Sequence, residues 1–418
     1  MSCKTKLLEQ IDLRHSVRIL CATIFTGAAL LSSSARLAAS PAHSSHDYFV
    51  YVGTYTNGES KGIYLYRFDE ETGQMTSLGL AAETANPSFL ITDPTHRYLY
   101  AVNEMANRSP DTPRGGFHKG TISSFAIDPK TGSLKFLNSV SSGGSGPCHL
   151  AIDKLGRILF VANYGSGSVA SYAILKDGSI GAMTWFDQHH GSSVNPKRQE
   201  GPHAHEVVIS PDNRFLFVPD LGLDHILIYR IDEAKRTFSP NNPPYVAVNP
   251  GLGPRHFTFA PDGKFAYAVC EMGSSVVAFS YDRETGALTP IQTISTLPEG
   301  YTGENASAEI HIDKSGRFLY ASNRGQNTIT EFDIDKSTGK LTRVQDFSVE
   351  GKTPRNFVID PSGRYLIAAN QDSNNIVVFK IDPANGHLTP ANENLEQGAP
   401  VCLQFVPEEG AAASVHGE

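Results

Sequence analysis

Residues 358–371 read VIDPSGRYLIAANQ, two apolar segments separated by a turn that carries a basic residue. Five other segments repeat this pattern: ITDPTHRYLYAVNE (91–104), AIDKLGRILFVANY (151–164), VISPDNRFLFVPDL (208–221), TFAPDGKFAYAVCE (258–271) and HIDKSGRFLYASNR (311–324). After most copies a third strand follows, such as VVFKID (377–382), and a Thr-Gly turn often leads to a fourth. Four short antiparallel strands in about 50 residues are typical of one β-propeller blade.

The two ends of the repeat region favour a closed ring. Residues 47–83 contain strands two to four of a unit but lack strand one, whereas 399–407 (APVCLQFVP) form a strand one with nothing after it. Together they complete a seventh blade, which leaves no bare inner edge. A solenoid shares the period but does not explain the split unit, and a ring of six blades leaves one unit unplaced. We therefore predict an all-β fold, a seven-bladed β-propeller whose last blade is closed by the C-terminal strand.

The composition excludes several classes of protein. The formal net charge is −8, which argues against a general binder of nucleic acid or of anionic membranes. Hydrophobic residues make up 40% of the chain and aromatic residues 9%, too many for a disordered protein. Cys148, Cys270 and Cys402 lie in apolar, strand-like segments without close spacing, so we expect buried free thiols and no disulfide framework.

The first 46 residues differ from the rest. A basic start precedes the apolar run ILCATIFTGAALL (19–31), and the small-residue stretch SSSARLAASPA follows. This order is typical of a secretory signal peptide, and the run is short for a membrane span. The alternative is a disordered extension that results from a misassigned start codon. We predict a signal peptide and linker (1–46), a propeller domain (47–407) and a flexible tail (408–418). The protein is then periplasmic or secreted, without membrane insertion of the mature domain, or cytoplasmic if the leader is not used.

Polar side chains gather where the innermost strands begin. The eighth residue before each basic residue is Phe89, His149, Glu206, His256, Glu309 or Asn356. The ninth is Ser88, Cys148, His205, Arg255, Ala308 or Arg355. The sixth residue after it is often asparagine, as at Asn163 and Asn323, and the seventh is Glu104, Glu271 or Arg324 in three of the units. Because all inner strands of a propeller start at the same mouth of the central channel, we expect these side chains to converge there.

Converging imidazole, guanidinium and carboxylate groups suit acid–base chemistry on an anionic substrate. Structural alternatives remain open. Asparagine at strand ends is common in turns, and a histidine at a strand start can satisfy a backbone group. Arg255 and Arg355 can instead pair with Glu206 and Glu309 across the channel.

Motifs of other enzyme classes are absent or incomplete. His205-Glu206 starts like a zinc-protease motif, but position 209 is isoleucine and the segment is a strand. His203-x-His205 lacks a third ligand, and the glycine-rich SGGSG (142–146) precedes a strand rather than a helix. The chain contains no G-x-S-x-G nucleophile motif. We therefore predict neither a metal nor a cofactor.

Several of these segments carry a family resemblance. FVYVGTYT (49–56), GPCHLAID (146–153), GPRHF (253–257), SNRGQNTI (322–329) and TPRNFVID (353–360) resemble the seven-bladed propeller lactonases. That family includes the propeller-type 6-phosphogluconolactonases and is similar to the fungal carboxymuconate cyclase. The resemblance covers about 47–407, all seven blades.

The resemblance implies a site that coincides with the columns above, together with His203 and His311, which lie within two residues of them. Arg198 is the exception, a residue of the long loop before Gly201. We predict the following catalytic residues: His203, His205, Arg255, Glu309 and His311. The predicted substrate-binding residues are Arg198, His149, His256, Arg355, Asn163 and Asn323.

The expected function is metal-independent hydrolysis of a small anionic lactone, with 6-phosphogluconolactone as the leading substrate. Arg255 would stabilise the oxyanion, and Arg198 or Arg355 would hold the substrate anion. Export favours a different sugar lactone or a muconate-type lactone, because 6-phosphogluconolactone is a cytosolic metabolite. A cyclase acting on a carboxylated product and a non-enzymatic binding propeller of the cell envelope are the other candidates.

Overall fold

The computed structural model describes residues 47–105, 120–232 and 237–408. The chain divides into two units, Met1–Ala42 and His43–Glu418, and only the second contains described residues. The predicted signal peptide therefore lies outside the described residues. The predicted tail does so as well, except for Glu408, and both stay predictions.

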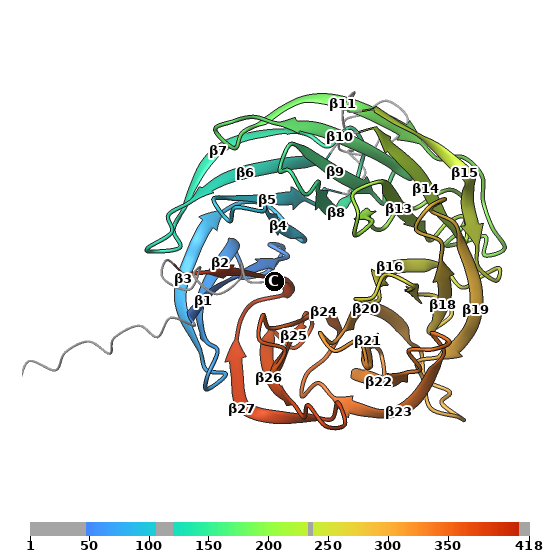
Figure 1. Ribbon diagram of the computed structural model, residues 1–418. Coiled ribbons are helices and arrows are strands. Elements are labelled where there is room, and N and C mark those ends of the chain that lie inside the picture. The colour runs from blue at the N-terminus through green and yellow to red at the C-terminus, as the bar shows by residue number, and fades with distance from the viewer. Residues whose placement is uncertain (1–46, 106–119, 233–236, 409–418) are drawn as a thin grey trace, which may run out of the picture. The chain divides into compact units, whose positions relative to one another are not determined.

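Seven antiparallel four-stranded sheets form the described unit, arranged around a centre as blades of a propeller (Figure 1). Blade 1 combines the two ends of the chain: β28 (Pro400–Pro407), β1 (Asp47–Thr54), β2 (Gly62–Asp69) and β3 (Met75–Glu83). Blade 2 contains β4 (Leu90–Thr92), β5 (Tyr98–Asn103), β6 (Thr121–Ile127) and β7 (Leu134–Ser141). Blade 3 contains β8 (Pro147–Ile152), β9 (Ile158–Asn163), β10 (Ser168–Ile174) and β11 (Ile180–Gln188). Blade 4 contains β12 (Val208–Ile209), β13 (Phe215–Asp220), β14 (His225–Asp232) and β15 (Thr237–Ala247).

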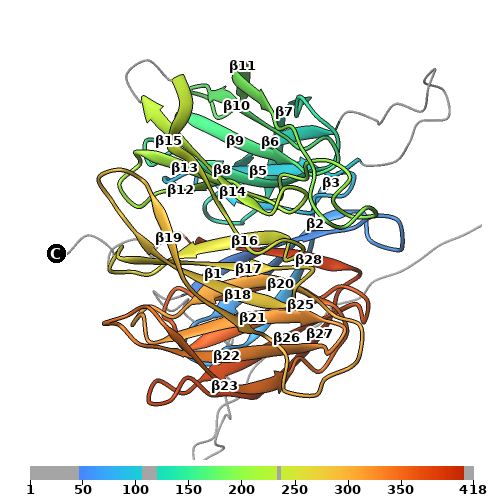
Figure 2. The ribbon, with the colours of Figure 1, turned by 90° about the vertical axis from the view of Figure 1, so that its right-hand side faces the viewer.

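The remaining three blades follow the same order. Blade 5 contains β16 (Pro254–Phe259), β17 (Phe265–Cys270), β18 (Ser275–Tyr281) and β19 (Leu288–Ser295). Blade 6 contains β20 (Ala306–Ile312), β21 (Phe318–Arg324), β22 (Thr328–Ile334) and β23 (Leu341–Ser348). Blade 7 contains β24 (Pro354–Ile359), β25 (Tyr365–Asn370), β26 (Asn375–Ile381) and β27 (Leu388–Glu396). Figure 2 shows the four strands of one blade, such as β20 to β23, lying side by side.

The ring closes as the sequence predicts. Strand β28 pairs antiparallel with β1, from Tyr48 opposite Pro407 to Gly53 opposite Cys402. In Figure 1 the red C-terminal strand accordingly lies beside the blue N-terminal blade. The seven-bladed fold and the role of the C-terminal strand are therefore confirmed.

Seven buried apolar clusters lie between neighbouring sheets, one at each junction. Tyrosines of the second strands add polar links between blades: Tyr51 donates to the carbonyl of Gly132 at 2.6 Å and Tyr320 to that of Gly386 at 2.6 Å. Each acceptor belongs to the turn between the last two strands of the adjacent blade, the position of the Thr-Gly motif in several units. Gly386 adopts a φ of +79°, and a Cβ there would collide with Phe318, so this turn requires glycine.

The repeated basic residue has a local role. In the turn before β25, Asp360 Oδ1 accepts the Tyr365 N–H at 2.6 Å, and Asp313 accepts those of Arg317 and Phe318 in the same way. The Arg317 guanidinium then lies 4.7 Å from the Phe318 ring centroid. The repeated residues that indicate the fold therefore stabilise turns and do not take part in catalysis. The three described cysteines are buried and free, as predicted.

Candidate active site

The inner strands place two consecutive residues at the channel because of a β-bulge. In β16 the register shifts between Pro254 and His256, so Arg255 is the extra residue. Equivalent register shifts make Cys148 the extra residue in β8 and Arg355 the extra residue in β24. A regular strand would point adjacent residues to opposite sides, whereas a bulge re-aims one of them. This explains why residues eight and nine positions before the basic residue meet in one cavity.

That cavity, the channel cavity, is lined by Ser88, Phe89, Cys148, His205, Arg255, His256, Glu309, Arg355, Asn356 and Val401. Five predicted site residues are among them. Its interior volume of about 10 Å³ is close to the room that one water molecule requires. A larger ligand therefore has to lie towards the mouth, above the buried histidines.

His256 and Glu309 form a hydrogen-bonded pair at the channel cavity. His256 Nδ1 donates to Glu309 Oε1 at 2.8 Å, which also accepts the Ile310 N–H at 3.0 Å. Glu309 Oε2 accepts the Asn356 side-chain amide at 2.6 Å. Burial alone would raise the pKa of Glu309, but His256 and the nearby cations hold this pKa below its ordinary value. Burial lowers the pKa of His256 to about 4, so the imidazole is neutral near pH 7.

With Nδ1–H directed at Glu309, the lone pair of His256 is on Nε2. The described residues form no hydrogen bond to His256 Nε2, whose partner at the other ring nitrogen is Glu309, so Nε2 is available to a water molecule or a ligand. A neutral imidazole oriented by an ionised carboxylate is the arrangement that a general base requires.

A second imidazole–carboxyl pair lies beside the first. His149 Nε2 is 3.4 Å from Glu206 Oε1, and Glu206 Oε2 accepts the Phe257 N–H. Burial, with the charge of Glu309 added, raises the pKa of Glu206 well above its ordinary value. The ring centroids of His149 and His256 are 5.3 Å apart. Two glutamates in equivalent positions therefore have pKa values shifted in opposite directions: that of Glu309 lies below its ordinary value and that of Glu206 lies above it.

Three arginines share one carboxylate at the mouth. Glu271 lies 2.6 Å from Arg198 Nη2, 2.8 Å from Arg324 Nη2 and 3.1 Å from Arg255 Nε. Arg255 Nη1 also donates to the Ala308 carbonyl at 2.6 Å. Burial and the adjacent arginines lower the pKa of Arg255 to about 10, which leaves it charged near pH 7. The cluster carries more positive than negative charge and is therefore suited to an anion.

Arg355 extends this positive region. Its guanidinium lies 5.3 Å from the Tyr55 ring centroid, and the Tyr55 hydroxyl donates to Glu104 at 2.9 Å. No described carboxylate lies within ion-pair distance of Arg355. The alternative in which Arg255 and Arg355 brace Glu206 and Glu309 is not observed, because Arg255 pairs with Glu271.

Tyr164 organises the rim on the other side. His203 stacks on its ring at 4.6 Å and is bonded through Nδ1 to its carbonyl at 2.9 Å. Arg198 Nη2 donates to its hydroxyl at 3.1 Å, and His205 meets its ring edge-on at 5.4 Å. His203 and Arg198 thus belong to the rim, whereas His205 lies in the channel cavity.

Three predicted site residues lie elsewhere. Asn163 is buried, with its amide bonded to the Ser142 carbonyl at 3.1 Å, and Asn323 accepts the Ser307 hydroxyl at 2.8 Å. Neither lines the channel cavity, which favours the structural role for both. His311 lies 3.9 Å from Glu309 Oε1 and lines an adjoining cavity, which shares Phe89, Glu309 and Asn356 with the channel cavity and also includes the predicted site residue His149.

The predicted site omitted Tyr55, Glu104, Tyr164, Glu271 and Arg324. All occupy one column, seven residues after the basic residue. The Tyr164 N–H bonds to the Gly146 carbonyl and the Glu271 N–H to that of Gly253. The Tyr55 N–H bonds to the Ala399 carbonyl in the same manner, so Tyr55 is the member of this column in blade 1. The sequence placed Glu104, Glu271 and Arg324 of this column at the mouth, but it did not show that Glu271 is shared by three arginines.

Comparisons with known proteins agree with this architecture. Residues 49–405 match the family model described as lactonase, 7-bladed beta-propeller. The chain is 33% identical over 311 residues to 6-phosphogluconolactonase of Bacillus subtilis, covering 74% of this chain and 84% of the relative. It is 35% identical to 6-phosphogluconolactonase of Formosa agariphila over 74% of this chain and 86% of the relative. The structure of the Pseudomonas aeruginosa periplasmic gluconolactonase superposes with a TM-score of 0.80 at 38% identity, covering 87% of this chain and 99% of that one.

The chain therefore belongs to the family of seven-bladed β-propeller lactonases. It is a lactone hydrolase, as the sequence predicts. Among the described residues, no helix is long and apolar enough to cross a membrane, and no group of three His, Cys, Asp or Glu side chains is arranged to hold a metal ion.

Proposed function

We propose that the protein hydrolyses the δ-lactone ring of a sugar acid, with 6-phosphogluconolactone as the leading substrate. The observation that carries this proposal is the combination of two features at one mouth. A neutral His256, oriented by an ionised Glu309, lies beneath a cluster of arginines with excess positive charge. The first feature activates water, and the second attracts an anionic lactone.

His256 acts as the general base. Its Nε2 takes a proton from a water molecule as the water oxygen attacks the lactone carbonyl carbon. Glu309 stabilises the resulting imidazolium through the 2.8 Å hydrogen bond to Nδ1. The carbonyl oxygen becomes an oxyanion, which the Arg255 guanidinium stabilises from its fixed position between Glu271 and the Ala308 carbonyl.

The tetrahedral intermediate collapses by breaking the bond between the carbonyl carbon and the ring oxygen. The imidazolium returns its proton to that oxygen, which leaves as a hydroxyl group. Lactone and water thus yield a hydroxy acid, whose carboxyl group then ionises and releases one proton. This reaction scheme requires neither a metal ion nor an oxidant.

Two observations support a phosphorylated substrate. Arg355 has no carboxylate partner among the described residues, and Arg198 is 44% exposed at the rim, so both can reach a substrate phosphate. Curated relatives at 33% and 35% identity are named 6-phosphogluconolactonases.

A specific observation favours a second candidate, hydrolysis of unphosphorylated gluconolactone in the periplasm. Residues 1–46 have the order of a signal peptide, and the chain is 38% identical to a periplasmic gluconolactonase. We infer export to the periplasm. Protein isolated from its native host should then begin near residue 36, 40 or 43, and cytosolic protein that starts at Met1 would refute export.

The test is an assay of initial rates above spontaneous hydrolysis for 6-phosphoglucono-δ-lactone, glucono-δ-lactone and a muconolactone, with and without EDTA. We expect the first or second compound to be the best substrate, and EDTA to leave its rate unchanged. A preference for the muconolactone would contradict the proposed substrate class, and loss of activity with EDTA would contradict the metal-free mechanism.

A further inference from the structure

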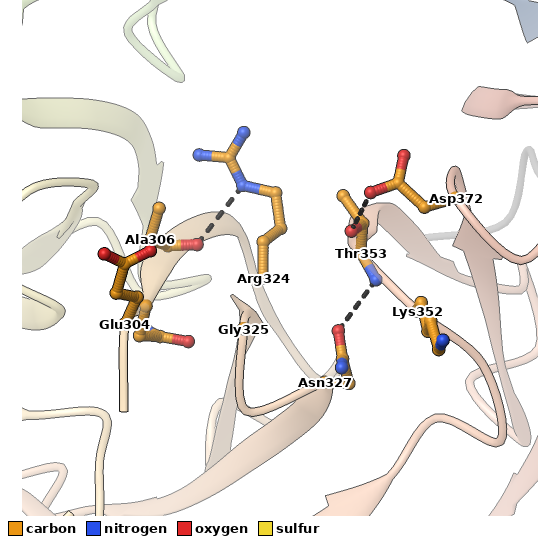
Figure 3. A pocket seen from close by; sticks show the side chains of 9 residues that line it. Glu304, Ala306, Arg324, Gly325, Asn327, Lys352, Thr353 and Asp372 are labelled. Carbon is orange, nitrogen blue, oxygen red and sulfur yellow. Dashed lines mark hydrogen bonds between the residues drawn. The ribbon is translucent and has the colours of Figure 1, made fainter. Parts of the chain in front are cut away.

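A second hollow opens on the mouth between blades 6 and 7, outside the channel cavity. This rim pocket has a volume of about 370 Å³ and is lined by Glu304, Ala306, Arg324, Asn327, Thr353 and Asp372, with Gly325, Asn305 and Lys352 completing it (Figure 3). Pockets that hold small organic ligands occupy about 300–1,000 Å³. The rim pocket is therefore large enough for a ligand group the size of a sugar ring.

The rim pocket adjoins the reaction site through two of its residues. Arg324 lines the pocket while Nη2 contacts Glu271, the carboxylate shared with Arg255. On the opposite wall, Thr353 is separated from Arg355 by a single residue. Figure 3 shows Arg324 and Thr353 on opposite sides of the opening, with Arg324 bonded to the Ala306 carbonyl and Thr353 to Asp372. A ligand whose reacting end lies over His256 can thus extend into this pocket.

The walls use two left-handed backbone positions that recur in other blades. Thr353 has a φ of +60° and Asn327 a φ of +59°, and the equivalent residues Gly253 and Asn374 have φ values of +63° and +55°. Asn327 Oδ1 accepts the Thr353 N–H at 2.8 Å, and Asp372 Oδ2 accepts the Thr353 hydroxyl at 2.5 Å. At the floor, a Cβ on Gly325 would lie 2.2 Å from the Glu304 carbonyl oxygen.

The chemistry of the lining favours a neutral polyhydroxy group over a phosphate. Within the described part of the chain, the Lys352 ammonium and the Glu304 carboxylate have no hydrogen-bonding or ion-pair partner. Together with Asp372 they place donors and acceptors of both signs around the opening. Sugar hydroxyls satisfy both kinds of group, whereas two carboxylates oppose a phosphate dianion. A phosphate finds better partners at Arg198 and Arg355.

From this lining and its place beside the reaction site, we propose that the rim pocket is a subsite for a glycosyl substituent. The enzyme then hydrolyses disaccharide aldonolactones, in which a second sugar is attached to the lactone ring, as well as the monosaccharide lactone. This inference rests on the proposed function, because the lactone has to react at His256 while its substituent occupies the pocket.

The test compares glucono-δ-lactone, 6-phosphoglucono-δ-lactone and 4-O-glucosylglucono-δ-lactone with the full-length enzyme and with Glu304→Ala and Lys352→Ala. Both side chains are exposed, so neither change should affect folding. We expect the disaccharide lactone to be hydrolysed by the wild type and its KM to rise about three- to tenfold in each variant, the effect of one lost hydrogen bond. KM for glucono-δ-lactone should stay unchanged. Lys340→Ala, an exposed residue in an outer turn of blade 6, is the matched control.

Three outcomes would overturn the subsite. The first is that the wild type does not hydrolyse the disaccharide lactone. The second is that both variants lose the same factor on all three lactones. The third is that KM rises selectively for the phosphorylated lactone, which would assign the pocket to phosphate. If the wild type hydrolyses no lactone at all, the proposed function itself fails, so the two failures are distinguishable.

Discussion

Replacing Glu309 with glutamine is expected to lower turnover by about 10²–10⁴-fold, the range for losing an oriented general base. The structure shows why an isosteric change is so harmful. Both carboxylate oxygens already accept hydrogen bonds, Oε1 from His256 and the Ile310 N–H, and Oε2 from Asn356. A glutamine side chain has to direct its NH₂ group at one of these donors.

Each orientation of the introduced glutamine amide has a cost. If NH₂ occupies the Oε2 position, it faces the Asn356 amide, which cannot rotate without losing the hydrogen bond that its Oδ1 accepts from the Leu403 N–H at 3.0 Å. If NH₂ occupies the Oε1 position, it faces His256 Nδ1. The imidazole then turns to the tautomer with hydrogen on Nε2 and can no longer accept a proton from water. An unsatisfied buried group adds a stability cost of about 1–3 kcal/mol.

Glu206→Gln is the matched control, because Glu206 has the same position in the repeat two blades earlier. The raised pKa of Glu206 favours its neutral form, which a glutamine resembles, and a glutamine keeps the acceptor for the Phe257 N–H. We expect turnover within about threefold of wild type. Initial rates on glucono-δ-lactone, with melting curves to verify folding, measure both variants. The reasoning is refuted if Glu309→Gln retains wild-type turnover, or if Glu206→Gln loses as much while folded.

Three further outcomes are expected. Burial lowers the pKa values of His149, His205 and His256, the last from 6.5 to about 4. Below pH 6.5 the unfolded chain therefore binds more protons at these three histidines than the folded chain does, which outweighs the opposite contribution of Glu206, whose raised pKa favours folding on acidification. The melting temperature should thus drop as pH falls from 6.5 to 4, while kcat/KM persists to about pH 5; a melting temperature that rises over this range contradicts the neutral imidazoles. Arg255→Lys should lower turnover by about 10²–10³-fold, because a lysine cannot both hold Glu271 and face the oxyanion. Arg355→Lys should mainly raise KM, and more for an anionic lactone than for a neutral one. Wild-type kinetics in both variants would contradict the roles of the two arginines. Deleting residues 399–407 removes β28, the inner strand of blade 1, and should abolish soluble folded protein; a soluble truncation with unchanged melting would contradict closure by this strand.

The sequence predicts the fold because its repeat records local chemistry. The turn aspartates, the alternation of the strands and the Thr-Gly turns each act within one or two blades, so every copy signals the same unit independently. The site is only partly visible in this manner. The columns identified Arg255, His256 and Glu309, but the alternation of a regular strand would separate the first two. The bulge that brings them together follows a proline at the strand start, Pro254, a signal recognised only with the structure.

The asparagine column shows the opposite failure. Asn163 and Asn323 have the polarity and spacing of site residues, but they precede the turn between the second and third strands. Their amides bind neighbouring backbone and hydroxyl groups there. A polar residue type that recurs at one position of the repeat shows that the position has the same surroundings in each blade. For the asparagines these surroundings are a turn within the blade and not the channel.

The two glutamates of the channel show what decides between equivalent positions. Around the ring, the column eight residues before the basic residue places His149, Glu206, His256, Glu309 and Asn356 on successive blades. Each carboxyl group therefore has one neighbour on either side. Glu309 is bonded on both sides, to His256 and to Asn356, and is ionised. Glu206 lies 3.4 Å from His149, accepts the Phe257 N–H and has no bond to His256, so burial dominates and raises its pKa. The hydrogen bond from His256 and the nearby charge of Arg255 thus determine which carboxylate orients the base, and the same residue type acquires opposite roles from its position in the ring.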